Sequence, residues 1–100
     1  MRQIEIPLPA ELGSAAVERR IDEAIFQSGL QVGLRGALKK YPGCIHWHVK
    51  TQGEPGTLEI TFWPEQHRAW FAIQSGRRAP WIDGAIERLG ELLLQRWNTA

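Results

Sequence analysis

Two runs of alternating residues between Tyr41 and Trp63 constrain the fold of this chain more than any other feature. Apolar side chains occupy every second position of both runs: Ile45, Trp47, Val49, Leu58, Ile60 and Phe62. The positions between them carry Cys44, His46, His48, Lys50, Thr57, Glu59, Thr61 and Trp63. Because the side chains of a strand point alternately to its two faces, each run predicts a strand with one apolar face. Residues 52–56 between the runs include two glycines and a proline, which favour a chain reversal.

A hairpin that places Lys50 opposite Thr57 brings both apolar sets to the same side of the sheet. A shift of one residue would turn one set to the wrong side, so the alternation predicts the parity of the register. The pairs expected in this register are His48 with Glu59, His46 with Thr61 and Cys44 with Trp63.

The segment before this hairpin begins with a predicted strand and a predicted helix. Residues 2–8 alternate, but Pro7 and Pro9 favour an edge strand, or one paired only through its first half, because proline cannot donate to a central ladder. Helical periodicity follows, and the sequence leaves a start at about Pro9 or at Ser14 open. Gly29 is expected to end this helix, since glycine accepts the left-handed conformation of a C-terminal cap.

A second strand is predicted over residues 32–39, where Gly33 and Gly36 indicate a bulge or close packing. The following Tyr-Pro-Gly-Cys sequence at residues 41–44 predicts a tight turn, with proline at its second position and glycine at the third position of a type II turn. The pairs expected across this turn are Lys39 with His46 and Ala37 with His48.

After the hairpin, residues 70–75 predict the last strand and residues 80–97 predict a second helix with one apolar stripe. The element order is therefore β-α-β-β-β-β-α. Because each helix has one apolar stripe and each strand one apolar face, the sequence predicts a two-layer α+β domain. It has a mostly antiparallel sheet and both helices on one face. The first strand can join the sheet in parallel through a right-handed helical crossover. The sequence leaves open whether this strand lies at the edge or pairs with the last strand.

The length and composition of the chain limit the classes of protein to which it can belong. One hundred residues predict a single domain spanning residues 1–100. The formal net charge of +1 gives no argument for nucleic acid or a membrane surface, and one cysteine cannot form an internal disulfide. No apolar run approaches the roughly 20 residues of a membrane span, and the N-terminus lacks the apolar segment of a secretory signal. We therefore expect a soluble, cytoplasmic protein that binds no membrane.

Two helices can cover one face of the sheet, and nothing in the chain is left to cover the other. That face is expected to carry Arg35, Lys39, Tyr41, Cys44, His46, His48, Glu59, Thr61, Trp63, Trp70 and Gln74. An exposed surface with aromatic anchors implies a binding partner. The first hypothesis is therefore a binding module that forms a homodimer or binds another protein or a small-molecule ligand. The residues assigned to this surface are Tyr41, His46, His48, Glu59, Trp63, Trp70 and Arg77. The alternative is that the tryptophans pack against loops or helix ends of their own chain.

The second hypothesis is a metal or acid–base site at His46, His48 and Glu59. A His-x-His pair on a strand places both imidazoles on one face, and the predicted register adds a carboxylate from the next strand. Two histidines and one carboxylate with open positions can hold divalent iron, zinc or manganese and activate water. The alternative is a pair of strand histidines bonded to Glu59, Thr61 or water, so the sequence leaves open whether the protein is an enzyme.

The third hypothesis is binding of single-stranded nucleic acid, because aromatic side chains on a sheet can stack bases. Basic residues such as Arg35, Lys39, Arg77 and Arg78 lie on or near the same face. The near-neutral net charge and the absence of the aromatic signature of RNA-recognition domains argue against this hypothesis.

Overall fold

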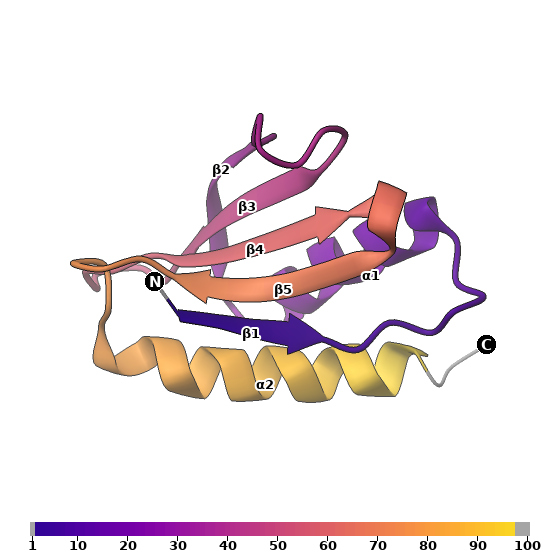
Figure 1. The fold of residues 1–100 in the computed structure, drawn as a ribbon. Coiled ribbons are helices and arrows are strands. Elements are labelled where there is room, and N and C mark those ends of the chain that lie inside the picture. Colours follow the sequence, from indigo (N-terminus) through magenta and orange to yellow (C-terminus); the bar gives the residue numbers. More distant parts are fainter. Residues whose placement is uncertain (1, 98–100) are drawn as a thin grey trace.

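Antiparallel strand pairing organises the chain into one five-stranded sheet of order β1-β5-β4-β3-β2 (Figure 1). The computed structural model describes residues 2–97. The strands are β1 (Arg2–Ile6), β2 (Gln31–Gly36), β3 (Ile45–Lys50), β4 (Leu58–Trp63) and β5 (Arg68–Ile73). The helices are α1 (Ser14–Gln27), α2 (Pro80–Trp97) and the short 3-10 helix η1 (Pro64–Gln66). The α+β class and the predicted order of strands and α-helices are therefore confirmed.

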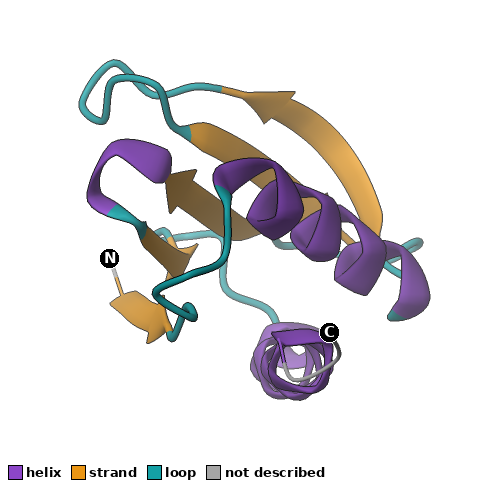
Figure 2. Ribbon diagram, turned by 90° about the vertical axis from the view of Figure 1, so that its right-hand side faces the viewer, coloured by secondary structure: helices purple, strands orange, loops and turns teal. Residues whose placement is uncertain are grey.

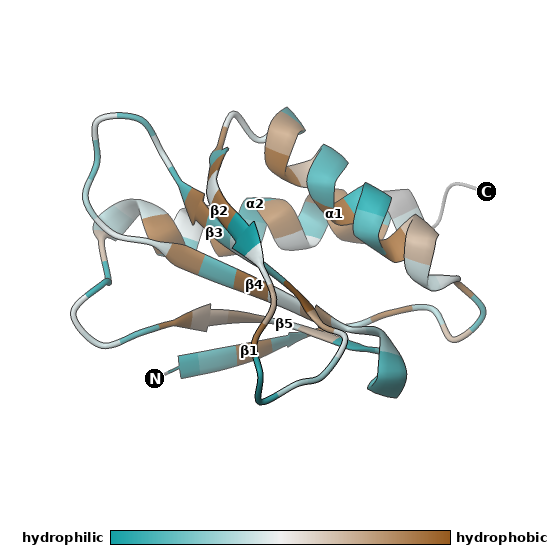
Figure 3. Cartoon of the chain, turned by 90° about the horizontal axis from the view of Figure 1, so that it is seen from above, coloured by the Kyte–Doolittle hydropathy of each residue, from teal (hydrophilic) through white to brown (hydrophobic). Residues whose placement is uncertain are grey.

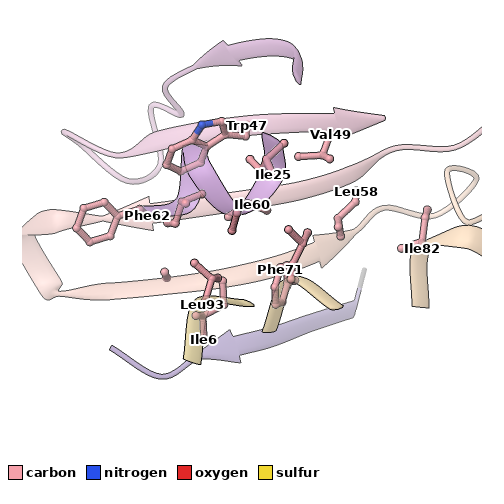
Figure 4. Close-up of a cluster of buried hydrophobic side chains, with 14 of the residues drawn as sticks. Ile6, Ile25, Trp47, Val49, Leu58, Ile60, Phe62, Phe71, Ile82 and Leu93 are labelled. Carbon is pink, nitrogen blue, oxygen red and sulfur yellow. The ribbon is translucent and has the colours of Figure 1, made fainter. Parts of the chain in front are cut away.

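Both α-helices lie on the same side of the sheet, as the sequence predicts (Figure 2). Hydrophobic and hydrophilic residues alternate in bands along α1 (Figure 3), and its buried residues form one stripe that faces the sheet. Apolar side chains of β3, β4 and β5 meet side chains of both helices in one core (Figure 4). The largest fully buried members are Trp47, Phe62, Ile21, Ile25, Leu58, Ile60, Ile82, Leu89 and Leu93. Within residues 2–97, neither α-helix combines the length and apolarity that a membrane crossing needs.

The register predicted for the central hairpin and the tight turn predicted before it are both confirmed. His46 pairs with Thr61 and His48 with Glu59, in the register that the alternation predicts. The turn at residues 41–44 is closed by the Cys44 N–H, which donates to the Tyr41 carbonyl at 3.0 Å. Gly43 at its third position has φ of 81°, the left-handed value that a type II turn requires.

The structure determines the position of the first strand, which the sequence leaves open. It ends at Ile6 and occupies one edge of the sheet, as the prolines that follow it indicate, and it pairs antiparallel with β5. Helix α1, which starts at Ser14, carries the chain past the whole sheet to the opposite edge, where β2 begins. Four successive antiparallel pairings leave β1 and β2 running in the same direction, so the helical crossover between them is parallel, but it joins the two edge strands and not neighbours. The four later strands then follow one another as antiparallel neighbours, and β1 completes the edge beside the last of them.

In the second strand, the side chains after Gly33 point to the faces opposite to those predicted. The register shifts between Val32 and Leu34, so Gly33 does mark a bulge. The extra residue turns every later side chain to the opposite face, because a strand alternates with a period of two. Leu34 consequently lies opposite His48, and Arg35 lies opposite Trp47 on the helix side, where it bonds to residues of α1.

The predicted position of Arg35 on the uncovered face is therefore wrong. The predicted pairs of Lys39 with His46 and Ala37 with His48 are also wrong. The strand ends at Gly36, which itself lies opposite His46. Residues 37–44 form a loop instead of the second half of a strand.

Candidate metal centre

The face of the sheet opposite the helices is not bare, because residues from the 37–44 loop contact it. The Tyr41 ring lies against two indoles, with centroid distances of 5.1 Å to Trp63 and 4.9 Å to Trp70. The Trp63 indole N–H donates to the Pro42 carbonyl at 3.0 Å. Trp70 is 2% exposed and Trp63 is partly buried. The expectation of exposed tryptophan anchors is therefore wrong for Trp70, and the alternative of packing within the chain describes both indoles.

Three of the predicted site residues meet beneath this loop. Glu59 lies directly opposite His48 in the β3–β4 ladder, and His46 lies on the same face two residues earlier in β3. The Nε2 atom of His46 is 3.0 Å from Oε1 of Glu59, and the two imidazole centroids are 5.0 Å apart. One ligand atom from each of the three side chains lies within 4.8 Å of the others. The strand ladder thus holds two imidazoles and a carboxylate at the separation of a metal-binding cluster.

The His46 ring is fixed by a second contact. Its Nδ1 atom lies 2.7 Å from the Thr61 hydroxyl oxygen, and both residues are buried. Burial lowers the pKa of His46 below its ordinary value of 6.5, although the neighbouring Glu59 carboxylate acts to raise it, and His48 lowers it further. The imidazole is therefore held neutral near pH 7. The donor and the acceptor of the Nδ1–Thr61 contact depend on the tautomer of the ring. A metal bound at Nε2 requires the tautomer in which Nδ1–H donates to the hydroxyl oxygen.

Glu59 has an incompletely satisfied carboxylate. The residue is 3% exposed, and among residues 2–97 its Oε2 atom is buried with no hydrogen-bond partner. A buried polar atom without a partner costs about 1–3 kcal/mol, and more when the group carries charge. A cation beside Oε2 removes that cost, because carboxylate oxygen is a common metal ligand.

A cavity of about 200 Å³ opens in front of this cluster. We call it the histidine cavity, and its lining consists of Gln3, Leu38, Lys40, Tyr41, His46, His48, Glu59, Thr61, Trp70, Ala72 and Gln74. Strand alternation places Gln74 on this face, but Gln3 is part of the wall only because β1 pairs with β5. Leu38 and Lys40 reach it only because the 37–44 loop folds back.

The remaining predicted residues do not join the cluster. Tyr41 and Trp70 line the histidine cavity, whereas Trp63 and Arg77 do not. Arg77 lies in the segment between β5 and α2, where its carbonyl accepts the Thr57 N–H at 3.1 Å. The third histidine, His67, donates from Nε2 to the Pro9 carbonyl at 2.8 Å and stands outside the cluster.

Comparisons of this chain with protein-family models, with curated proteins and with solved structures found no match. The functional assignment therefore rests on the geometry of the three side chains and on the cavity in front of them.

Proposed function

We propose that this protein binds a divalent transition-metal ion through His46, His48 and Glu59. The unpartnered buried Oε2 atom of Glu59, next to two imidazoles, is the observation that carries this proposal. Two ligands at about 2.1 Å from one ion and at right angles to each other lie about 3.0 Å apart. The Nε2–Oε1 distance of 3.0 Å matches that separation.

A purely hydrogen-bonded cluster accounts for the same contacts less completely. The Thr61 hydroxyl can donate to Nδ1 of His46 while Nε2–H donates to Oε1 of Glu59, which satisfies that ring. This arrangement leaves Oε2 without a donor. An ion bound to both oxygens of the carboxylate and to both imidazoles satisfies all three groups, including Oε2.

Two histidines and one carboxylate leave coordination positions free for water or a ligand. The histidine cavity supplies the space for such a ligand beside the cluster. We place its action in the reducing cytoplasm, where a buried free thiol such as Cys44 persists. Nucleic-acid binding has little support, since Arg35 is ion-paired to α1 and Trp70 is buried.

Metal titration of protein purified without a histidine tag and stripped with chelator tests the proposal. Isothermal calorimetry with Zn²⁺ is expected to give one ion per chain, and Co²⁺ is expected to give visible ligand-field absorption. Glu59→Gln and His48→Gln should each lower the affinity by about tenfold or more, since even residues that only orient a ligand typically contribute 10–100-fold.

His67→Asn is the matched control for these variants. It removes an imidazole, and asparagine tolerates the left-handed φ of 50° at that position. Its Zn²⁺ affinity should equal that of the parent. Absence of one-to-one binding in the parent, or equal losses in the His67 and His48 variants, would contradict the proposal.

A further inference from the structure

A second hollow lies between the edge strand β1 and helix α2, which run close together (Figure 1). Its volume is about 360 Å³, and it shares no lining residue with the histidine cavity. We call it the β1–α2 groove, and its lining consists of Ile4, Glu5, Ile6, Pro7, Phe71, Ile86, Glu87, Gly90, Glu91, Leu93, Leu94 and Trp97. Most of these side chains are apolar, and Leu94 is 58% exposed. Its size falls at the lower end of the range of ligand-binding clefts.

The groove lies beside the edge strand β1 of the sheet. Residues 4–7 are consecutive and all line it, although neighbouring side chains of a strand point to opposite faces. The wall that β1 contributes is therefore not made by the side chains of one sheet face alone. Within the described part of the chain, β1 pairs with β5 alone, so the backbone groups on its outer side have no strand partner. Such an edge is a template for another extended segment.

Two carboxylates give the groove an acidic rim. Glu87 and Glu91 line it from α2, four residues apart on one helix face. Like charges at this spacing repel each other. Neither has an ion-pair partner among the side chains that the structure describes, those of residues 2–95 and 97. The third carboxylate, that of Glu5, bonds to Arg68. A segment with basic side chains would neutralise the two unpaired groups.

Gly90 keeps the groove open between these two glutamates. Glycine inside a helix costs about 1 kcal/mol relative to alanine. A Cβ atom at Gly90 would meet no neighbouring atom within 4 Å, so close packing within the chain does not require glycine there. A larger side chain at this position would occupy the groove.

We propose that the β1–α2 groove binds an extended peptide segment of a partner protein, which adds to β1 as a further antiparallel or parallel strand. Alternate apolar side chains of the peptide enter the groove beside Ile4, Ile6 and Leu94, and basic side chains pair with Glu87 and Glu91. This is the strand-addition mode of peptide recognition, in which backbone bonds give affinity and pockets give specificity. The proposal is independent of metal binding.

Selection from a library of random heptapeptides displayed on phage tests this proposal with the full chain as bait. Seven residues slightly exceed the length of β1. Enriched sequences are expected to alternate apolar residues and to include lysine or arginine. The most enriched peptide, made synthetically, should then bind in a fluorescence-anisotropy titration and slow hydrogen exchange of the β1 amides. A copy methylated at alternate backbone nitrogens should not bind, because it cannot form the strand ladder.

Gly90→Leu should weaken this binding by about tenfold or more, the loss expected when a contact pocket is filled. Gly84→Leu is the matched control, since Gly84 lies in the same helix, has no atom within 4 Å of its Cβ position and does not line the groove. The double variant Glu87→Gln, Glu91→Gln should weaken binding and reduce its dependence on salt. Failure to enrich such peptides would overturn the proposal. Equal binding by the methylated peptide, or a parent dimer that Gly90→Leu dissociates, would also overturn it.

Discussion

At the scale of single residues, the candidate centre depends on the environment of His46. Burial holds its pKa below 6.5 in the folded protein, whereas the unfolded chain has the ordinary value. Between these two pKa values the unfolded state binds more protons than the folded state, so the free energy of unfolding rises with pH across that window. The stabilising contribution is complete above about pH 6.5 and is lost as the pH falls through the folded-state pKa.

We therefore expect metal-free protein to lose stability as the pH is lowered from 7.5 to 5. Urea unfolding at several pH values in the presence of chelator measures this loss. His46→Gln removes the titrating group, so its free energy of unfolding should depend less steeply on pH than that of the parent. Parallel pH profiles for the two proteins would show that His46 is not the group responsible.

The Thr61 hydroxyl is expected to act by positioning the His46 ring. Thr61→Val keeps the shape of the side chain and removes the oxygen that lies 2.7 Å from Nδ1. Zn²⁺ affinity should fall by about 10–100-fold, the usual effect of losing an outer partner of a metal-bound histidine. Thr57→Val removes another buried hydroxyl near the same strand, outside the cluster, and should leave the affinity unchanged. A comparable loss in both variants would point to general destabilisation of β4.

At the scale of elements, β2 and the loop after it differ most from the sequence pattern, beginning with the bulge at Gly33. The bulge reverses the parity of β2, so Arg35 reaches α1. The strand then ends at Gly36, and the chain that follows supplies Tyr41 to the indoles of β4 and β5. The bulge thus accounts for the side to which Arg35 points, and the loop after β2 makes the uncovered sheet face the wall of a cavity.

The segment before β4 gives a stability prediction based on two glycines. Gly53 and Gly56 have φ of 79° and 97°. A Cβ atom at Gly56 would lie 2.7 Å from the Ala79 Cβ and 2.9 Å from the Arg77 carbonyl oxygen, whereas one at Gly53 would meet nothing within 4 Å. Gly53→Ala should cost about 1–2 kcal/mol, the penalty for a left-handed alanine. Gly56→Ala should cost about 1–3 kcal/mol more, because steric overlap adds to that penalty.

Urea denaturation of the two alanine variants measures both penalties under the same conditions. The difference between them isolates the close approach of residues 77–79 to Gly56. Equal stabilities would mean that this segment moves away without cost.

At the scale of the whole molecule, the homodimer expected from the sequence stays a prediction. The surface through which the two copies would meet differs from the one that the sequence suggested. Trp70 is buried, so this indole is unavailable to a second copy. The β2 edge instead presents Val32 and Leu34, which are 43% and 60% exposed. An apolar edge strand is a common site of pairing between copies.

Light scattering at increasing concentration measures the mass of the particle against the chain mass of 11.4 kDa. If the homodimer forms through β2, the parent should approach twice that mass and Leu34→Lys should stay monomeric. Leu94→Lys, which changes an exposed leucine on α2, should behave like the parent. A parent that stays monomeric at millimolar concentration would rule out the homodimer.

Hydrophobic patterning was sufficient to predict the class of fold, the order of its elements and the meeting of His46, His48 and Glu59. Strand alternation has a period of two and both hairpin runs have one apolar face, so burial of that face selects the register and puts the three side chains together. The position of β1 beside β5, the side to which Arg35 points and the cover over the indoles come from the assembled fold. Each of these depends on contacts between segments distant in the sequence or on one extra residue at Gly33. Neither of these two causes can be recognised in the hydrophobic pattern of a single element.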